Sequence, residues 1–261
     1  KKFLLKSIFL MKKKLLIFII TYKASFRLRN VFNEIPFKKL KKYNYKVLIC
    51  DDASKDDTII YAKKIKQKNK NIIVIENKKN LGYGGNIKKC LNYSLKKNFN
   101  YAVMIHGDGQ YSPKYIPNLA KILDTKPMIS ATTGSRVLKG IKSVLDGGMP
   151  FYKLIGNIVL TNFFNLLFMK NYTDAHTGLW AYNLKQFKKT KFNNLTNGYN
   201  FDQEFRFMSV LLNKNIKEIP IKTKYGDERS QVHIKYAINF FFKTILFFLI
   251  KLKIFNSKKF N

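Results

Sequence analysis

Short apolar runs alternate with polar stretches of helical periodicity along the first half of the chain. The runs are five or six residues long, and most lack the strict alternation of a half-exposed strand, as is typical of strands buried on both faces of a sheet. One polar stretch begins with Ser112 and Pro113, a cap followed by a first-turn proline. The expected strands are residues 15–20, 46–50, 72–76, 101–105 and 129–133, and the expected helices are residues 58–69, 86–97 and 113–124.

This alternation predicts a doubly wound α/β fold with a mostly parallel sheet. Ligands bind to such sheets where the carboxyl ends of the strands open into loops. Four polar segments follow the first four expected strands, and the fold would bring them to one edge of the sheet. They are residues 21–22 (TY), 51–58 (DDASKDDT), 80–86 (NLGYGGN) and 106–110 (HGDGQ).

Two of these segments have the chemistry that a nucleotide requires. Asp51 and Asp52 stand at a strand end, where a carboxylate can accept hydrogen bonds from a base or from ribose hydroxyls. Gly82 and Gly84 allow the backbone to approach a ligand closely, at the start of a helix whose N-terminus attracts anions. An acidic turn can also serve only as a helix cap, but four polar segments at one edge favour a binding site.

The segment after the fourth expected strand offers ligands for a hard metal ion. Asp108 carries a carboxylate suited to Mg²⁺ or Mn²⁺, and the amide oxygen of Gln110 could add to it. Such an ion would neutralise a departing diphosphate. One aspartate in a glycine-rich turn can equally be explained by turn chemistry alone.

The motifs together resemble the GT-A domain of family 2 glycosyltransferases, especially the branch related to dolichol-phosphate mannose synthase. After a Thr-Tyr start come CDDASKDDT, NLGYGGN, GDGQYSP and TGSR, and the resemblance extends from about residue 15 to residue 229. It implies an inverting glycosyltransferase that moves a hexose from a nucleoside-diphosphate sugar to a polyprenyl phosphate, for cell-envelope glycan synthesis. It also implies a divalent metal, Mn²⁺ or Mg²⁺, as cofactor.

The resemblance assigns roles to individual residues. For the nucleotide sugar these residues are Thr21, Tyr22, Asp51, Asp52, Gly82, Gly84, His106 and Asp108; for the metal they are His106, Asp108 and Gln110. Four positions, in three segments, depart from the family pattern. Lys23-Ala24 replaces Asn-Glu, His106 replaces the first aspartate of the metal motif, and Trp180 replaces a basic residue after the glycine of DAHTGLW. A neutral imidazole can bind Mn²⁺ but suits Mg²⁺ poorly.

The second half supplies the candidates for acceptor binding and catalysis. Arg136, Lys153 and Arg229 fall at or near the positions where polyprenyl-phosphate transferases place cations for the acceptor phosphate. To Asp108 of the first half, the second half adds the catalytic candidates Asp174, Asp202 and Glu204. A sugar hydroxyl needs a general base, whereas a lipid phosphate is already an anionic nucleophile and needs mainly positioning and charge stabilisation.

Two alternatives to this function remain open at this point. The acceptor can be a lipid-linked saccharide, with Asp202 or Glu204 as base, or the protein can bind a nucleotide sugar without turnover. A sugar-nucleotide pyrophosphorylase fits less well, because its glycine-rich signature would follow the first strand.

The charge of the chain is strongly positive, since 50 basic and 15 acidic residues leave a net charge of +35. Such a charge suits nucleic acid or anionic lipid, and it also fits a compositional bias toward lysine, because lysines are scattered through every segment. The chain shows no helix-turn-helix or stacking-platform pattern, so we expect no nucleic-acid partner. Cys50 and Cys90 lack the spacing of a zinc site or a disulfide framework.

The chain is expected to comprise an N-terminal extension (1–14), a GT-A domain (15–232) and a membrane-interfacial hydrophobic, basic helix with its tail (233–261). In this helix, the uncharged run between Lys243 and Lys251 is only seven residues long. A membrane span requires roughly 20 apolar residues. An interfacial helix with lysines facing anionic lipid fits better. Residues 151–169 are a second candidate, and a tilted span or a core helix remain the alternatives. We therefore expect a peripheral protein at the cytoplasmic face of the cell membrane.

Overall fold

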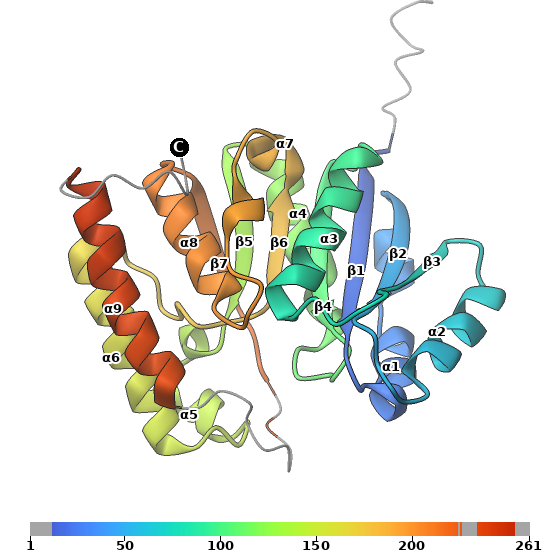
Figure 1. The fold of residues 1–261 in the computed structure, drawn as a ribbon, viewed down its shortest axis with the longest axis horizontal. Helices are drawn as coiled ribbons and strands as arrows, with labels where there is room; N and C mark the ends of the chain where they lie inside the picture. Colours follow the sequence, from blue (N-terminus) through green and yellow to red (C-terminus); the bar gives the residue numbers. More distant parts are fainter. Residues whose placement is uncertain (1–11, 224, 226–233, 254–261) are drawn as a thin grey trace, which may run out of the picture.

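The computed structural model describes residues 12–223, 225 and 234–253. A seven-stranded sheet forms its centre, in the order β3-β2-β1-β4-β6-β5-β7 (Figure 1). Strand β6 is antiparallel to its neighbours β4 and β5, and the other described strand pairs are parallel. The strands are β1 (Lys14–Thr21), β2 (Asn44–Asp51), β3 (Ile72–Glu76), β4 (Tyr101–His106), β5 (Ile129–Ser135), β6 (Trp180–Asn183) and β7 (Asn215–Pro220).

Helices cover both faces of this sheet. They are α1 (Ser25–Asn33), α2 (Thr58–Gln67), α3 (Tyr83–Lys96), α4 (Ile116–Thr125), α5 (Ile141–Leu145), α6 (Phe151–Phe168), α7 (Leu184–Phe187), α8 (Phe201–Leu211) and α9 (Ile234–Lys251). Short 3₁₀ turns lie at Phe37–Leu40, Pro113–Tyr115, Val137–Lys139 and Phe192–Asn194. The predicted doubly wound α/β fold is therefore confirmed, as is a helix near the C-terminus.

The two faces of β1 explain why its sequence lacks strict alternation. Even-numbered residues such as Phe18 pack in a cluster with α3, α6 and α8, while odd-numbered residues such as Ile17 pack in a second cluster with α1, α2 and α4. Both side chains are fully buried. A strand between two helical layers has no solvent side and therefore no polar positions.

All five strands expected from the sequence are present, but β6, β7 and α1 were not predicted. Strand β6 has four residues, and β7 is an alternating edge strand with lysine and glutamate. Helix α1 buries only Leu28 and Val31, so its apolar pattern is weak. The helix expected at residues 113–124 opens with a 3₁₀ turn at Pro113 and continues as α4.

Helices α6 and α9 pack side by side at the end of the molecule remote from β3 (Figure 1), and the rings of Phe163 and Phe241 lie 4.7 Å apart. Helix α6 has two apolar faces. One is buried and includes Leu154 and Phe164, and the other exposes Tyr152 and Val159 to solvent. This end of the molecule therefore combines helix packing with an apolar surface.

The expected domain boundaries fall close to element boundaries. Strand β1 begins at Lys14, one residue before the expected start of the GT-A domain, and α9 begins at Ile234. Residues 1–11 of the expected extension and the end of the expected tail lie outside the described residues, as does Arg229.

Candidate active site

A cavity of about 1030 Å³ opens at the carboxyl ends of β1, β2 and β4, the edge predicted to bind a ligand. Loops after the strands form one side of it, and α6, α8 and α9 contribute Lys153, Asp202 and Tyr236 to the other. Of the residues expected at the site, those that line the cavity are Thr21, Tyr22, Asp52, Gly82, His106, Asp108, Gln110, Arg136, Lys153 and Asp202.

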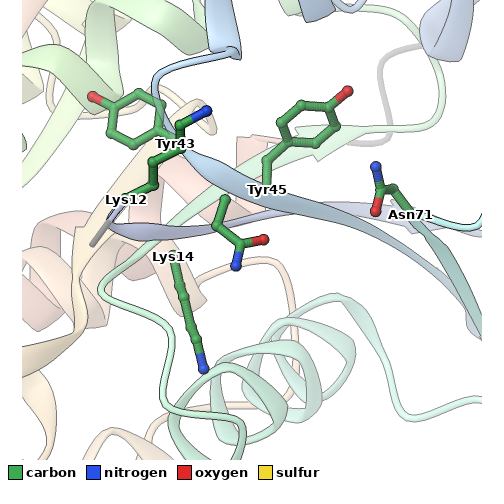
Figure 2. A pocket seen from close by; sticks show the side chains of 6 residues that line it. Lys12, Lys14, Tyr43, Tyr45 and Asn71 are labelled. Atoms are coloured by element: carbon green, nitrogen blue, oxygen red, sulfur yellow. The ribbon is translucent and has the colours of Figure 1, made fainter. Parts of the chain in front are cut away.

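A second, smaller pocket of about 390 Å³ lies at the opposite edge of the sheet, near the amino ends of β1 and β2. Figure 2 shows Lys12, Lys14, Tyr43, Tyr45 and Asn71 around it. None of the residues expected at the site lines this pocket. The larger cavity is therefore the candidate active site.

The two aspartates after β2 have different environments. Asp51 is fully buried and accepts hydrogen bonds from the backbone N–H of Ser54 (2.9 Å), the hydroxyl of Ser54 (2.6 Å) and the hydroxyl of Thr21 (3.1 Å). Asp52 lines the cavity, and its Oδ1 accepts from Asn77 at 2.7 Å and from the Leu81 N–H at 2.8 Å. Asp51 thus shapes the turn, and Asp52 is the carboxylate placed to contact a ligand.

The glycines before α3 pack against a neighbouring loop. The N–H groups of Gly84 and Gly85 donate to the carbonyl oxygen of Asn197 at 2.7 and 3.2 Å. A Cβ on Gly84 would lie 2.4 Å from the carbonyl oxygen of Thr196, so a side chain has no room there. Gly82, with φ +79°, lines the cavity. Gly84 is therefore required by a close approach, as expected, but the group that approaches it is the backbone of residues 196–197 and not a ligand.

Tyr83 joins His106 to Asp202. Its hydroxyl donates to Asp202 Oδ2 at 2.6 Å and lies 3.1 Å from His106 Nε2. The single phenolic proton can be donated to only one of these two partners; when Asp202 accepts it, His106 donates from Nε2 and keeps its lone pair on Nδ1. Burial lowers the pKa of His106, so the imidazole is neutral near pH 7.

Asp202 and His176 are buried groups of the same wall. Burial raises the pKa of the Asp202 carboxyl to about 7, although the hydrogen bond from Tyr83 acts in the opposite direction. Burial also lowers the pKa of His176 to about 4. Among the described residues, neither Oδ1 of Asp202 nor Nε2 of His176 has a hydrogen-bond partner. Both residues line the cavity, but these two unpartnered atoms are themselves buried.

Asp108 fits a metal that is shared with a substrate. It is half-buried at the cavity, and its Oδ1 accepts from the Gln110 N–H at 2.9 Å. Within the described residues there is no group of three or more His, Cys, Asp or Glu side chains that could hold an ion. Mg²⁺ is commonly held by one or two carboxylates together with substrate phosphates and water. Asp108 and Gln110 fit that arrangement, not an all-protein cage, and the neutral imidazole of His106 would suit Mn²⁺ better than Mg²⁺.

Arg136 and Asp174 form a buried ion pair. The guanidinium contacts Asp174 through Nε (2.6 Å) and Nη2 (2.8 Å), and its Nη1 donates to the hydroxyl of Tyr225 at 2.7 Å. Burial alone would raise the pKa of Asp174, but the charge of Arg136 holds it well below its usual range. Arg136 lines the cavity whereas Asp174 does not. Asp174 therefore orients the guanidinium from behind.

Glu204 lies behind the cavity wall and does not line it. Its Oε2 accepts from the Thr196 N–H at 2.8 Å, and its Oε1 accepts from Lys243 of α9 at 2.6 Å. Only 2% of its side chain is exposed. Of the two expected base candidates on α8, the structure places Asp202 at the cavity and Glu204 in a buried ion pair.

Trp180 is fully buried in β6 and does not line the cavity. The guanidinium of Arg206, from α8, lies 4.9 Å from its ring and 4.6 Å from that of Tyr172. The basic residue that the family pattern places at this position is absent, but the buried guanidinium of Arg206, from helix α8, lies beside the ring of Trp180.

Sequence reasoning missed most of the tyrosines of the cavity. Tyr83 and Tyr111 stand inside the motifs NLGYGGN and GDGQYSP, so their position is a usable signal. Nothing in the sequence connects Tyr236 of α9 to loops more than a hundred residues earlier. The missed tyrosines that line the cavity are Tyr83, Tyr111, Tyr199, Tyr225 and Tyr236.

Comparison with known proteins defines the class of this protein. The model of the family described as Glycosyl transferase family 2 matches residues 16–191. The chain belongs to this family and is a glycosyltransferase with a GT-A fold.

Particular relatives are similar over most of their length. A UDP-N-acetylglucosamine–dolichyl-phosphate N-acetylglucosaminyltransferase of Methanococcus voltae is 29% identical, over 83% of this chain and 88% of its own. An undecaprenyl-phosphate mannosyltransferase of Micrococcus luteus is 25% identical, over 67% of this chain and 70% of its own. The crystal structure of glucosyl-3-phosphoglycerate synthase from Mycobacterium tuberculosis with UDP superposes with a TM-score of 0.64 at 14% identity, covering 94% of this chain and 82% of that one, which shows a shared fold.

Proposed function

We propose that this glycosyltransferase moves a hexose from a nucleoside-diphosphate sugar to a polyprenyl phosphate at the cytoplasmic face of a membrane, with inversion at the anomeric carbon. The two relatives described above differ in the sugar that their names give, but both names give a polyprenyl phosphate as acceptor. The acceptor class is therefore the feature that they support, and the sugar is left to experiment.

The donor end of the proposed site is the loop side of the cavity. Asp52 and Tyr22 line this side and would contact the base and ribose, and Asp108, which follows β4, lines the cavity too. A divalent metal held by Asp108 would supply Lewis-acid stabilisation of the diphosphate. His106, held by Tyr83, adds a neutral imidazole next to the same group.

One observation carries the choice of acceptor. Lys153 lines the cavity from the first turn of α6, and its neighbours on that helix, Phe151 and Tyr152, are 62% and 71% exposed. Arg136 lines the cavity from the end of β5. Cations at the cavity beside an exposed apolar helix are what an amphiphilic phosphate needs, because its head is anionic and its chain is apolar.

The chemistry asks little of a base. A phosphate oxygen of the acceptor would attack the anomeric carbon while the bond from that carbon to the departing diphosphate breaks. The acceptor is already an anion near neutral pH, so no proton needs to be removed. Positioning by Lys153 and Arg136 and stabilisation of the growing diphosphate charge would provide the rate enhancement.

The apolar face of α6 and α9 supports a peripheral position on the membrane. Helix α6 is long and apolar enough, by length and composition alone, to cross a membrane. Its Asn157 donates to Asp174 at 3.0 Å, and the hydroxyl of its Thr161 accepts from the Ala175 N–H at 3.1 Å. A helix that crossed the bilayer would give up these bonds to the catalytic domain, so we favour α6 and α9 lying in the interface.

A second candidate function is transfer to a lipid-linked saccharide. Asp202 favours it, because a carboxyl at the cavity with a pKa of about 7 is poised to act as general base toward a sugar hydroxyl. Binding of a nucleotide sugar without turnover also stays open, because His106 replaces an expected carboxylate at the metal site.

Transfer by the purified protein tests the proposal. UDP- and GDP-sugars would be offered with undecaprenyl phosphate in detergent, with Mn²⁺, Mg²⁺ or chelator. We expect label from one donor to enter the lipid phosphate and chelator to abolish it. Transfer only to a saccharide lipid would support the second candidate, and nucleotide binding without any transfer would support the third.

A further inference from the structure

Helix α9 forms part of the wall of the cavity as well as part of the exposed surface. Its Tyr236 lines the cavity, and the ring of its Phe240 lies 4.3 Å from that of His176. Asn239 accepts a hydrogen bond from Asn200 at 3.0 Å. A helix near the C-terminus thus touches the site through successive turns.

Helix α9 also forms an ion pair with α8, between Lys243 and Glu204. The side chain of Lys243 is 24% exposed and that of Glu204 is 2% exposed, and the two atoms are 2.6 Å apart. Glu204 uses its second oxygen to accept from the Thr196 N–H at 2.8 Å. Lys243 therefore holds, through one carboxylate, the start of the segment 196–200.

Segment 196–200 is a wall of the donor end. Its Asn197 carbonyl accepts from Gly84 and Gly85 at the start of α3. The ring of Tyr199 stacks at 5.7 Å on Tyr83, the residue that joins His106 to Asp202. Gly198, Tyr199 and Asn200 all line the cavity. Displacement of this segment would alter the surroundings of a bound nucleotide.

The opposite side of α9 carries exposed apolar residues. Ile238, Phe242 and Leu246 are 51%, 64% and 45% exposed, whereas Phe240 and Thr244 are fully buried. One helix therefore presents an apolar face to the surroundings and an ionic and aromatic face to the cavity wall.

We propose that contact of α9 with a lipid surface strengthens donor binding, and that Glu204 is the positioning residue that transmits this effect from Lys243 to segment 196–200. Membrane contact and nucleotide binding then reinforce each other, because each favours the same placement of α9. The inference rests on the membrane part of the proposed function, and it gives Glu204 a role other than that of a base.

Nucleotide affinity with and without lipid tests this coupling. Binding of UDP and of GDP to the full-length protein would be measured by calorimetry, alone and with vesicles of anionic phospholipid. We expect vesicles to tighten binding of the preferred nucleotide about fivefold or more. We expect Lys243→Met and Glu204→Gln to lose most of this gain while still binding vesicles, and Lys243→Arg to retain it.

Lys251→Met is the matched control, because Lys251 lies on the same helix and its ammonium faces the ring of Phe168 instead of segment 196–200. It removes the same charge and should keep the gain. Thermal melts of each variant separate loss of coupling from loss of folding.

Some results would contradict only the proposed coupling, and one would also contradict the proposed membrane binding. An undiminished gain in Lys243→Met, or an equal loss in Lys251→Met, overturns the coupling alone. Vesicle binding by the unmodified protein without any change in nucleotide affinity does the same. Failure to bind vesicles at all overturns both the coupling and the membrane part of the proposed function.

Discussion

The cavity has a strand-built end, made by the loops after β1, β2 and β4, and a helix-built end, made by α6, α8 and α9. At the strand-built end, side chains such as Asp52 are held by hydrogen bonds to the loop after a neighbouring strand, β3. At the helix-built end, side chains are held by pairs between docked helices, such as Lys243 of α9 with Glu204 of α8. The first end is determined by sheet topology, and the second depends on how helices dock.

Loss of Asp174 should have the largest effect on stability, because it leaves the buried Arg136 without its carboxylate. We expect Asp174→Ala to lower the free energy of unfolding by about 3–5 kcal/mol. Glu76→Ala, which breaks the exposed pair with Lys63, should cost less than about 1 kcal/mol. Urea unfolding of both variants measures this, and similar losses would show that the Arg136–Asp174 pair is not a structural anchor.

Asp108 is the test of the strand-built end. We expect Asp108→Ala to lower turnover by about 100-fold or more, because it removes the carboxylate proposed to hold the metal beside the diphosphate. The melting temperature should change little, since Asp108 is half-buried in a turn. Asp146→Ala, at an exposed position outside the cavity, is the control. Near-normal turnover in Asp108→Ala would remove Asp108 from the mechanism.

Lys153 tests the helix-built end separately. We expect Lys153→Met to raise KM for the polyprenyl phosphate about tenfold, because one phosphate contact is lost, while nucleotide affinity stays the same. Initial rates at varied acceptor and calorimetry with nucleotide separate the two. A loss of nucleotide affinity instead would place Lys153 at the donor.

Asp202 should produce the smallest effect, seen as a dependence of stability on pH. Its pKa of about 7 in the folded protein exceeds the ordinary 3.8, so the folded state keeps the proton longer than the unfolded state does. Its contribution is therefore fully present below about pH 4 and is lost as the pH rises to about 7. Relative to the native protein, Asp202→Asn should gain about 6 °C in Tm between pH 4.5 and pH 8. A gain of the opposite sign would show that Asp202 is ionised throughout.

The contrast between the two ends also explains what could be predicted from sequence. The positions of Thr21, Asp52 and Asp108 followed from buried runs that end in polar loops, because parallel strands bring their carboxyl ends to one edge. The inward contribution of Tyr236 could not be predicted, because it depends on α9 docking against α8.

The sequence also could not show which motif residues contact the protein itself instead of a ligand. Asp51 and Gly84 stand in motifs that indicate nucleotide binding, yet their contacts are to Ser54 and to the Thr196–Asn197 backbone. A motif identifies the loop that approaches a ligand, but which of its side chains faces the ligand depends on the fold around it.

The acceptor is the central claim, and mass spectrometry of the lipid product tests it most directly. The protein would be given its preferred donor with equal amounts of undecaprenyl phosphate and an undecaprenyl-diphosphate saccharide. We expect the monophosphate to gain the mass of one hexose while the saccharide lipid is unchanged. Extension of the saccharide lipid alone would contradict the account and make Asp202 the base to investigate.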